Sequence, residues 1–277
     1  MESPLWAPSS RVTTIPRLAS EDWQVDVGRV EATIRSDTKY LVINEPYNPA
    51  GTLMTRENQS RLVEVASGHG IVVFSDEVYR LLEHDPSKRL PAMCDVYSRG
   101  ISCVTLSKPW GGCGITIGWL AVQDPEIKQK LVDAQYFGTA CPSRASEIQA
   151  IMTLRASDAI LSKNLAIIRR NLALLGSFIH RNEDLFGWVK PTAGAVAFVK
   201  FKGPLTSEEL GLELSRAGIS IKPAYCFSPA DSITPDIDYF RVGYGEANMP
   251  RALEALEEFV KCHRASWTSS VQATTQS

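Results

Sequence analysis

Lys108 stands between an apolar stretch and four closely spaced glycines in the segment TLSKPWGGCGITIGWL, residues 105–120. Glycine-rich loops can bind phosphates, and a lysine amine can form a Schiff base with a carbonyl cofactor. A P-loop places its lysine after the glycines, whereas Lys108 precedes them, and the dinucleotide motif G-x-G-x-x-G misses its third spacing here by one residue. Two interpretations therefore remain: a Schiff-base lysine, or a surface lysine beside a flexible loop.

A carboxylate follows another apolar run. Asp76 comes directly after IVVFS (71–75), and Tyr79 lies three residues further on. At the carboxyl end of a buried strand, where α/β sheets bind ligands, such a carboxylate could keep the ring nitrogen of a pyridine cofactor protonated. Asp76 could equally cap a following helix, which is a common role for aspartate. Tyr79 would lie on the same face of the turn and could reach the phenolic oxygen of the cofactor.

An asparagine occupies the corresponding place after a third apolar run. Asn48 lies in NEPYNPAG (44–51), which follows YLVIN (40–44). Its side-chain amide could donate to the same cofactor oxygen, or the segment could be an ordinary Asn-Pro turn, with Gly51 reversing the chain.

The elements that must position these residues alternate between short apolar runs and longer amphipathic ones, which is typical of an α/β protein. A helix is expected over 55–67, capped by Thr55, and another after the Asp124-Pro125 pair. The stretch 146–181 has an almost continuous helical pattern, and a break is expected near Ser157. Strands are expected at 40–44, 71–75, 101–106 and 116–122.

The C-terminal part predicts a small α+β unit. It contains expected strands at 194–201 and 239–245, a helix with a Thr206–Glu209 capping box, and a last helix over about 250–262. The expected domains are a partial large domain over 1–155, a small domain over 156–264 and a disordered tail over 265–277.

Composition narrows the class of protein. The 277 residues are 44% hydrophobic and carry a net charge of -2, which gives no electrostatic reason to expect a nucleic-acid partner. No apolar run reaches the roughly 18 residues that span a bilayer. The six cysteines form no C-x-x-C pair, so neither a metal site nor a disulfide framework is expected. The N-terminus lacks the pattern of a signal peptide, and a cytoplasmic location is expected.

Four segments together resemble the class I/II aminotransferases, which are pyridoxal 5'-phosphate (PLP) enzymes of fold type I. NEPYNPAG is similar to the family's N-P-x-N-P-T-G signature, SDEVY to its D-x-x-Y motif, and TLSKPWGGCGITIGW to its S-x-S-K-x-x-G-x-x-G-x-R-x-G-Y lysine motif. FRVGYG resembles the strand that carries the family's C-terminal arginine. The resemblance runs from about residue 3 to residue 262.

The resemblance implies a cofactor site. Lys108 would hold PLP as a Schiff base and move the α-proton of the substrate. Asp76 would keep the pyridine nitrogen protonated, Asn48 and Tyr79 would bond the phenolic oxygen, and Ser107 would contact the phosphate.

It also implies a substrate site and an assembly. Arg241 would bind the α-carboxylate of an amino acid or a 2-oxo acid, and the enzyme would exchange an amino group between the two. The expected fold is α/β, a mostly parallel sheet in an N-terminally truncated large domain plus a C-terminal α+β small domain. A homodimer is expected.

Two departures from the family leave alternatives open. Thr116 stands where the family has a phosphate-binding arginine, and the N-terminal portion of the family pattern is missing. The chain would then be a truncated product, a partial sequence, or a divergent protein with a rebuilt site. The alternatives to an aminotransferase are a PLP-dependent lyase or cyclase of the same fold, or a non-catalytic remnant.

Overall fold

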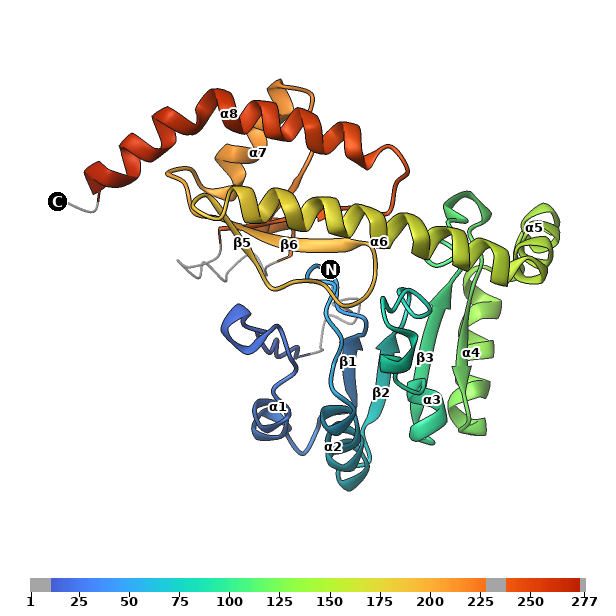
Figure 1. Ribbon diagram of the computed structural model, residues 1–277. Coiled ribbons are helices and arrows are strands. Elements are labelled where there is room, and N and C mark those ends of the chain that lie inside the picture. Colours follow the sequence, from blue (N-terminus) through green and yellow to red (C-terminus); the bar gives the residue numbers. More distant parts are fainter. Residues whose placement is uncertain (1–10, 228–237, 275–277) are drawn as a thin grey trace.

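Two β-sheets, joined by a long helix, organise the protein. The computed structural model describes residues 11–227 and 238–274 (Figure 1). The first sheet has the strand order β1-β2-β3-β4, in which β1, β2 and β3 run parallel and β4 is antiparallel to β3. Its strands are β1 (Tyr40–Asn44), β2 (Val72–Asp76), β3 (Gly100–Thr105) and β4 (Gly118–Val122). All four strands predicted for this part of the chain are confirmed, with ends shifted by at most two residues.

Helices cover this sheet and return the chain between its parallel strands. Thr55 Oγ1 accepts a bond from the Asn58 amide at 3.1 Å, which confirms the predicted cap of α2. Leu62 of α2 is fully buried in a core that also contains Val73 of β2 and Met93 of α3. The helices around this sheet are α1 (Val27–Thr33), α2 (Arg56–Gly68), α3 (Met93–Val96) and α4 (Pro125–Gly138). The apolar runs thus form buried strands because helices shield them from water.

The second sheet is antiparallel and has the order β5-β6-β8-β7. Its strands are β5 (Phe186–Trp188), β6 (Val196–Phe201), β7 (Lys222–Pro223) and β8 (Tyr239–Gly243). The predicted capping box at the start of α7 (Ser207–Arg216) is present, because Thr206 and Glu209 bond each other's backbone amides. In Figure 1, α6, α7 and α8 lie around this sheet.

The expected break in the long helical stretch falls at Ala156, between α5 (Arg144–Arg155) and α6 (Ser157–Arg181). The first turns of α6 pack on the first sheet, where Ile160 contacts the cluster of Leu106 and Trp110. Its later turns enter the core of the second sheet. The division of the chain at residues 155 and 156 stays a prediction, and α6 belongs to both packing units.

Helix α8 (Met249–Thr274) continues well beyond the predicted end near residue 262. The sequence predicted a disordered tail from residue 265, and the structure instead shows helix as far as Thr274. The polar composition of the tail concealed Trp267, which is 4% exposed and meets the ring of Phe201 with 5.0 Å between centroids. His263, one turn earlier, stacks on Phe259. Packing of these rings on the second sheet extends the helix.

None of the described helices combines the length and the apolar composition that a bilayer crossing requires.

Trp267 should therefore contribute to stability. Trp267→Ala removes a buried ring from the core, and we expect the free energy of unfolding to fall by about 3 kcal/mol. Leu212→Ala on α7 is the control, since Leu212 is 56% exposed. Urea denaturation followed by far-UV circular dichroism measures both. A loss below about 0.5 kcal/mol for Trp267→Ala, the range of ordinary surface substitutions, would contradict this packing.

Candidate active site

The carboxyl ends of β1, β2 and β3 meet at one edge of the first sheet. Asn44, the last residue of β1, pairs with Asp76, the last residue of β2, and Asp76 pairs in turn with Cys103 of β3. The loops that carry Asn48 and Lys108 leave β1 and β3 at this same edge. The loops that carry the predicted site residues therefore start side by side at this edge.

Hydrogen bonds from the end of β1 and from the following turn hold Asp76 in place. Its carbonyl accepts the Asn44 Nδ2 donor and the Glu45 amide, each at 3.0 Å. Its Oδ1 accepts the Val78 amide at 3.3 Å, and burial raises the pKa of the carboxyl. A turn rather than a helix follows over residues 78–81, so Asp76 caps no helix. Within residues 11–227 and 238–274, no cation bonds this carboxylate.

Arg241 and Asn48 are brought together from opposite ends of the chain. Arg241 lies on β8 of the second sheet, and its Nη1 donates to Asn48 Oδ1 at 2.9 Å. The Asn48 amide donates to Asn44 Oδ1 at 2.7 Å, which holds the turn in place. Oδ1 of Asn48 accepts from the guanidinium, and its Nδ2 has no hydrogen-bond partner among the described residues, so it can donate to another group.

Tyr79 lies between the two sheets. Only 6% of it is exposed, and it belongs to the core built around the second sheet. Burial raises the pKa of its hydroxyl, while Arg241 lowers that pKa and Asp76 raises it. At neutral pH the hydroxyl is protonated and can donate a hydrogen bond.

Lys108 follows β3 in a tight turn. Its carbonyl accepts the Gly111 amide at 3.2 Å, and Gly111 has a φ of +66°, a conformation that glycine adopts without strain. The side chain of Lys108 is exposed, and its Nζ has no hydrogen-bond partner in the part of the chain that the structure describes. Ser107 precedes it, and the Ser107 carbonyl accepts a bond from Cys113 Sγ at 3.2 Å. Gly111 therefore allows a tight turn beside an accessible amine.

Thr116 occupies a left-handed conformation with φ 58° at the end of the glycine-rich turn. Its Oγ1 donates to the Gly114 carbonyl at 3.4 Å, a bond within the turn itself. An open hollow of about 530 Å³ lies beside it, between this turn, the end of α4 and α5, and Arg144 is among the lining residues. Arg144 itself pairs with Glu147.

Backbone hydrogen bonds join the Asn48 turn to the segment that leads into β6 of the second sheet. The Gly51 carbonyl accepts the amides of Thr192 and Ala193, each at 2.8 Å. A Cβ on Gly51 would lie 2.4 Å from the Val196 carbonyl oxygen, so this position requires glycine for close approach as well as for its positive φ. The sequence predicted only the chain reversal, because the partner segment lies far along the chain.

A buried ion pair supports the same turn and was missed by the sequence analysis. Arg17 Nη1 lies 2.5 Å from Glu45 Oε1, and the two side chains are 10% and 8% exposed. The guanidinium of Arg17 also stacks over the Tyr47 ring at 4.1 Å, and Glu45 Oε2 accepts the Met54 amide. No motif signals Arg17, because it lies in an irregular segment remote from its partner in sequence.

Comparison with known proteins identifies the family. The family model for aminotransferase class I and II matches residues 6–256. The chain belongs to this family. The fold agrees, since a PLP-dependent aminotransferase from Streptococcus suis 89-1591 superposes with a TM-score of 0.80 at 29% identity, over 88% of this chain and 63% of that chain. The fold is that of the fold type I aminotransferases.

Curated relatives differ in their activities. The chain is 25% identical to aromatic-amino-acid aminotransferase 2 of Thermococcus litoralis over 89% of its length, and it covers 64% of that relative. It is 24% identical to capreomycidine synthase of Streptomyces vinaceus over 86% of its length, and it covers 60% of that relative. The chain thus spans somewhat less than two thirds of the length of these relatives.

The Arg17–Glu45 pair yields a prediction for stability. Arg17→Met leaves the Glu45 carboxylate buried without its partner, and we expect the free energy of unfolding to fall by about 3–5 kcal/mol. Burial already raises the pKa of Glu45 and Arg17 opposes that rise, so the variant raises the folded-state pKa further above the unfolded value. The folded state then binds the extra proton, and the loss of stability should be larger at pH 8 than at pH 5.

The double variant Arg17→Met/Glu45→Gln is the control, because it removes both charges. It should recover part of the stability and lose the added pH dependence in urea denaturation at the two pH values. Equal losses at pH 5 and pH 8 for the single variant would contradict the role given to Glu45.

Proposed function

We propose that the protein is a PLP-dependent aminotransferase that exchanges an amino group between an amino acid and a 2-oxo acid, with Lys108 as the residue that holds the cofactor. The observation that carries this proposal is the Arg241–Asn48 bond at 2.9 Å. It joins a candidate carboxylate-binding arginine of the second sheet to the edge of the first sheet from which Asp76 and Lys108 project.

The chemistry of the donor set fits the ring of the cofactor. Asp76 is a largely buried carboxylate whose pKa burial raises, and it lacks a cationic partner among the described residues. A protonated ring nitrogen would supply that partner and favour the ionised carboxylate. Tyr79 and Asn48 each offer a donor for the phenolic oxygen, because the Tyr79 hydroxyl is protonated and Asn48 uses its oxygen for Arg241.

On the substrate side, Arg241 would bind the α-carboxylate. Its guanidinium has five donors in a planar fork. Among the described residues only Asn48 takes one of them, so two others can form a bidentate pair with a carboxylate. The Phe227 ring lies 5.2 Å from Cζ of Arg241 and limits the positions that the guanidinium can take.

PLP, when bound, withdraws electrons from the α-carbon of the substrate. The residues of this chain would do the rest. Asp76 would hold the ring nitrogen protonated. Nζ of Lys108, once released from the cofactor, would take the proton from the α-carbon of the substrate and return it to the carbonyl-derived carbon of the cofactor. Arg241 would orient the substrate. The exposed position of Lys108 suits an amine that must reach both atoms.

The phosphate side fits less completely. Thr116 cannot supply the charge of the family's arginine, and a hydrogen bond to a charged group contributes about 1.5–3 kcal/mol. We therefore propose weaker cofactor binding than in relatives that keep the arginine, with Ser107 as one remaining hydroxyl near the turn.

A second candidate is a PLP-dependent lyase or cyclase that uses the same residues. The similarity to capreomycidine synthase, over 86% of this chain, favours keeping it. Transamination produces a 2-oxo acid from the amino donor, whereas an elimination that goes on to hydrolysis also releases ammonia, and the two products separate the candidates. Fold alone does not separate them.

We also propose a homodimer in the cytoplasm. Exposed apolar side chains on α4 and α5 support an association surface, since Tyr136, Phe137 and Met152 are 73%, 86% and 65% exposed.

Covalent cofactor binding tests the role of Lys108. When the protein is mixed with PLP and reduced with borohydride, we expect a stable mass increase on the peptide that contains Lys108, together with loss of the visible absorption band. Lys108→Ala should show neither the band nor the mass increase. The matched control is Lys163→Ala on α6, which should behave like the wild type. Labelling of several surface lysines without preference for Lys108 would contradict the proposal.

Turnover tests Asp76. Asp76→Ala removes the proposed partner of the ring nitrogen, a loss of about 3–5 kcal/mol for a broken buried pair. The rate of 2-oxo acid formation should fall by roughly two to four orders of magnitude. Covalent trapping at Lys108 should remain. Asp95→Ala on α3 is the control, and wild-type turnover in Asp76→Ala would remove Asp76 from the mechanism.

A further inference from the structure

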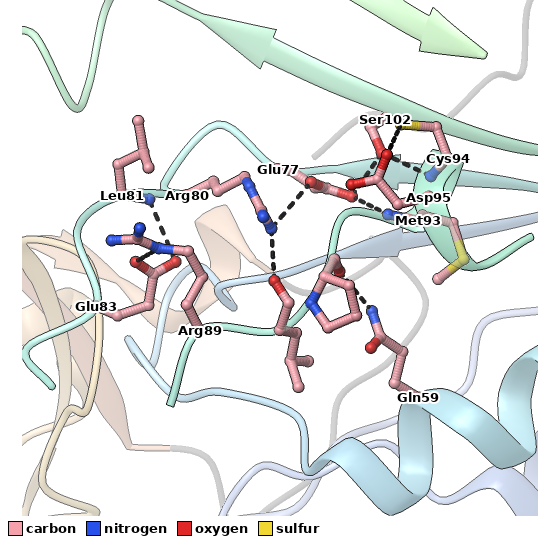
Figure 2. A network of polar contacts seen from close by, with 12 residues as sticks. Gln59, Glu77, Arg80, Leu81, Glu83, Arg89, Met93, Cys94, Asp95 and Ser102 are labelled. Atoms are coloured by element: carbon pink, nitrogen blue, oxygen red, sulfur yellow. Dashed lines mark hydrogen bonds and ion pairs between the residues drawn. The ribbon is translucent and has the colours of Figure 1, made fainter. Parts of the chain in front are cut away.

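Glu77 is a buried carboxylate that lies directly beside the candidate site in sequence and faces away from it. It is 4% exposed, and it lies between Asp76 and Tyr79 along the chain. Figure 2 shows its side chain directed toward α3 and β3. Its Oε1 accepts two bonds at 2.8 Å, from the Met93 amide and from Ser102 Oγ.

These bonds satisfy the start of α3. The Met93 amide donates to Glu77, and the Cys94 amide donates to Ser102 Oγ at 3.1 Å. The first two amides of this short helix therefore find their acceptors in the buried Glu77–Ser102 pair. Ala92, the residue before the helix, has no side chain that could cap it. Amides at a helix start need acceptors, and a carboxylate is a favourable one. Glu77 thus serves the helix as well as its own turn.

The other oxygen of Glu77 faces an arginine of the same turn. Oε2 lies 3.7 Å from Arg80 Nη1, too far for a hydrogen bond, and has no hydrogen-bond partner in the described part of the chain. Nη1 of Arg80 donates to the Leu90 carbonyl at 2.8 Å. Both residues line a cavity of about 20 Å³, which has room for one water molecule that could bridge them.

Backbone bonds hold the residue itself. The Glu77 amide donates to the Cys103 carbonyl at 2.9 Å, on the β3 side. The carbonyl of the preceding Asp76 accepts from Asn44 and Glu45, on the β1 side. After Glu77 the chain leaves the sheet. The bond between the Glu77 side chain and Ser102 then connects the turn to β3.

We propose that Glu77 is a positioning residue for the candidate cofactor site. It anchors residues 76–80, which comprise the end of β2 and most of the turn that follows, to β3 and α3, and so sets the directions in which Asp76 and Tyr79 project. The proposal deepens the function proposed above and rests on it, because Asp76 and Tyr79 need fixed directions only if they hold the cofactor ring.

Three variants and one control test this. Glu77→Ala removes both acceptors, and Ser102→Ala removes one donor but leaves the carboxylate. Glu77→Gln keeps an oxygen for Met93 and Ser102 and is the conservative rescue. Leu62→Ala is the matched control, because Leu62 is fully buried under the same sheet yet has no bond to the turn.

The first readout is hydrogen exchange of the protein without added cofactor. Exchange of the backbone amides over residues 76–80 should accelerate on the order of tenfold in Glu77→Ala, to a smaller extent in Ser102→Ala, and little in Glu77→Gln. Leu62→Ala should lower the melting temperature without a selective effect on this segment. An exchange pattern for Glu77→Ala that matches Leu62→Ala would overturn the proposal. If Glu77→Ala does not fold, Ser102→Ala compared with Leu62→Ala decides the same question.

The second readout is the dissociation constant of PLP, measured by titration of its visible band. Glu77→Ala should weaken binding on the order of tenfold, and Glu77→Gln should restore it to within about threefold. Unchanged PLP binding together with accelerated exchange would overturn the link to the cofactor. If the wild-type protein binds no PLP, the proposed function fails, and the exchange measurement still decides whether Glu77 anchors the turn.

Discussion

The parallel pairing of β1, β2 and β3 at their carboxyl ends is the constraint on which the candidate site depends. Asn44, Asp76 and Cys103 lie side by side, and the Asp76 carbonyl accepts two donors from the β1 side. A slip of one residue in this register would turn Asp76 to the opposite face of the sheet and expose the apolar residues that now face the helices. The register therefore fixes where three loops begin, and the site residues need only short loops to meet.

This dependence explains why the sequence predicts much of the site. Asn48, Asp76 and Lys108 each follow an apolar run, and the rule that parallel strands end at one edge places them together without any knowledge of the loops. The caps at Thr55 and Thr206 were also predictable, because a cap depends on residues only three positions apart. Local patterns and one topological rule therefore suffice for this part of the structure.

Contacts between remote segments were beyond the sequence. The bond between Arg241 and Asn48 joins residues 193 positions apart, and only the family resemblance indicated a role for Arg241. The Arg17–Glu45 pair depends on which segments the fold brings together, and the extension of α8 depends on the ring of Phe201 that Trp267 meets. Composition gives neither. The same holds for Glu77, which no sequence pattern singled out and which is 4% exposed in the structure.

The Arg241–Asn48 bond also bears on how a substrate could bind without disturbing the protein. A guanidinium without contacts would retain several side-chain conformations, and ordering it on binding would cost free energy. Asn48 accepts from one of the five donors of Arg241, and Phe227 lies against the face of the guanidinium. The side chain is therefore oriented beforehand, while no other described residue takes the remaining donors. A lysine at this position could keep the charge but not both contacts, since its single ammonium would have to serve Asn48 and the carboxylate from one point. The arginine therefore allows the second sheet to be linked to the first while the same side chain serves the proposed substrate.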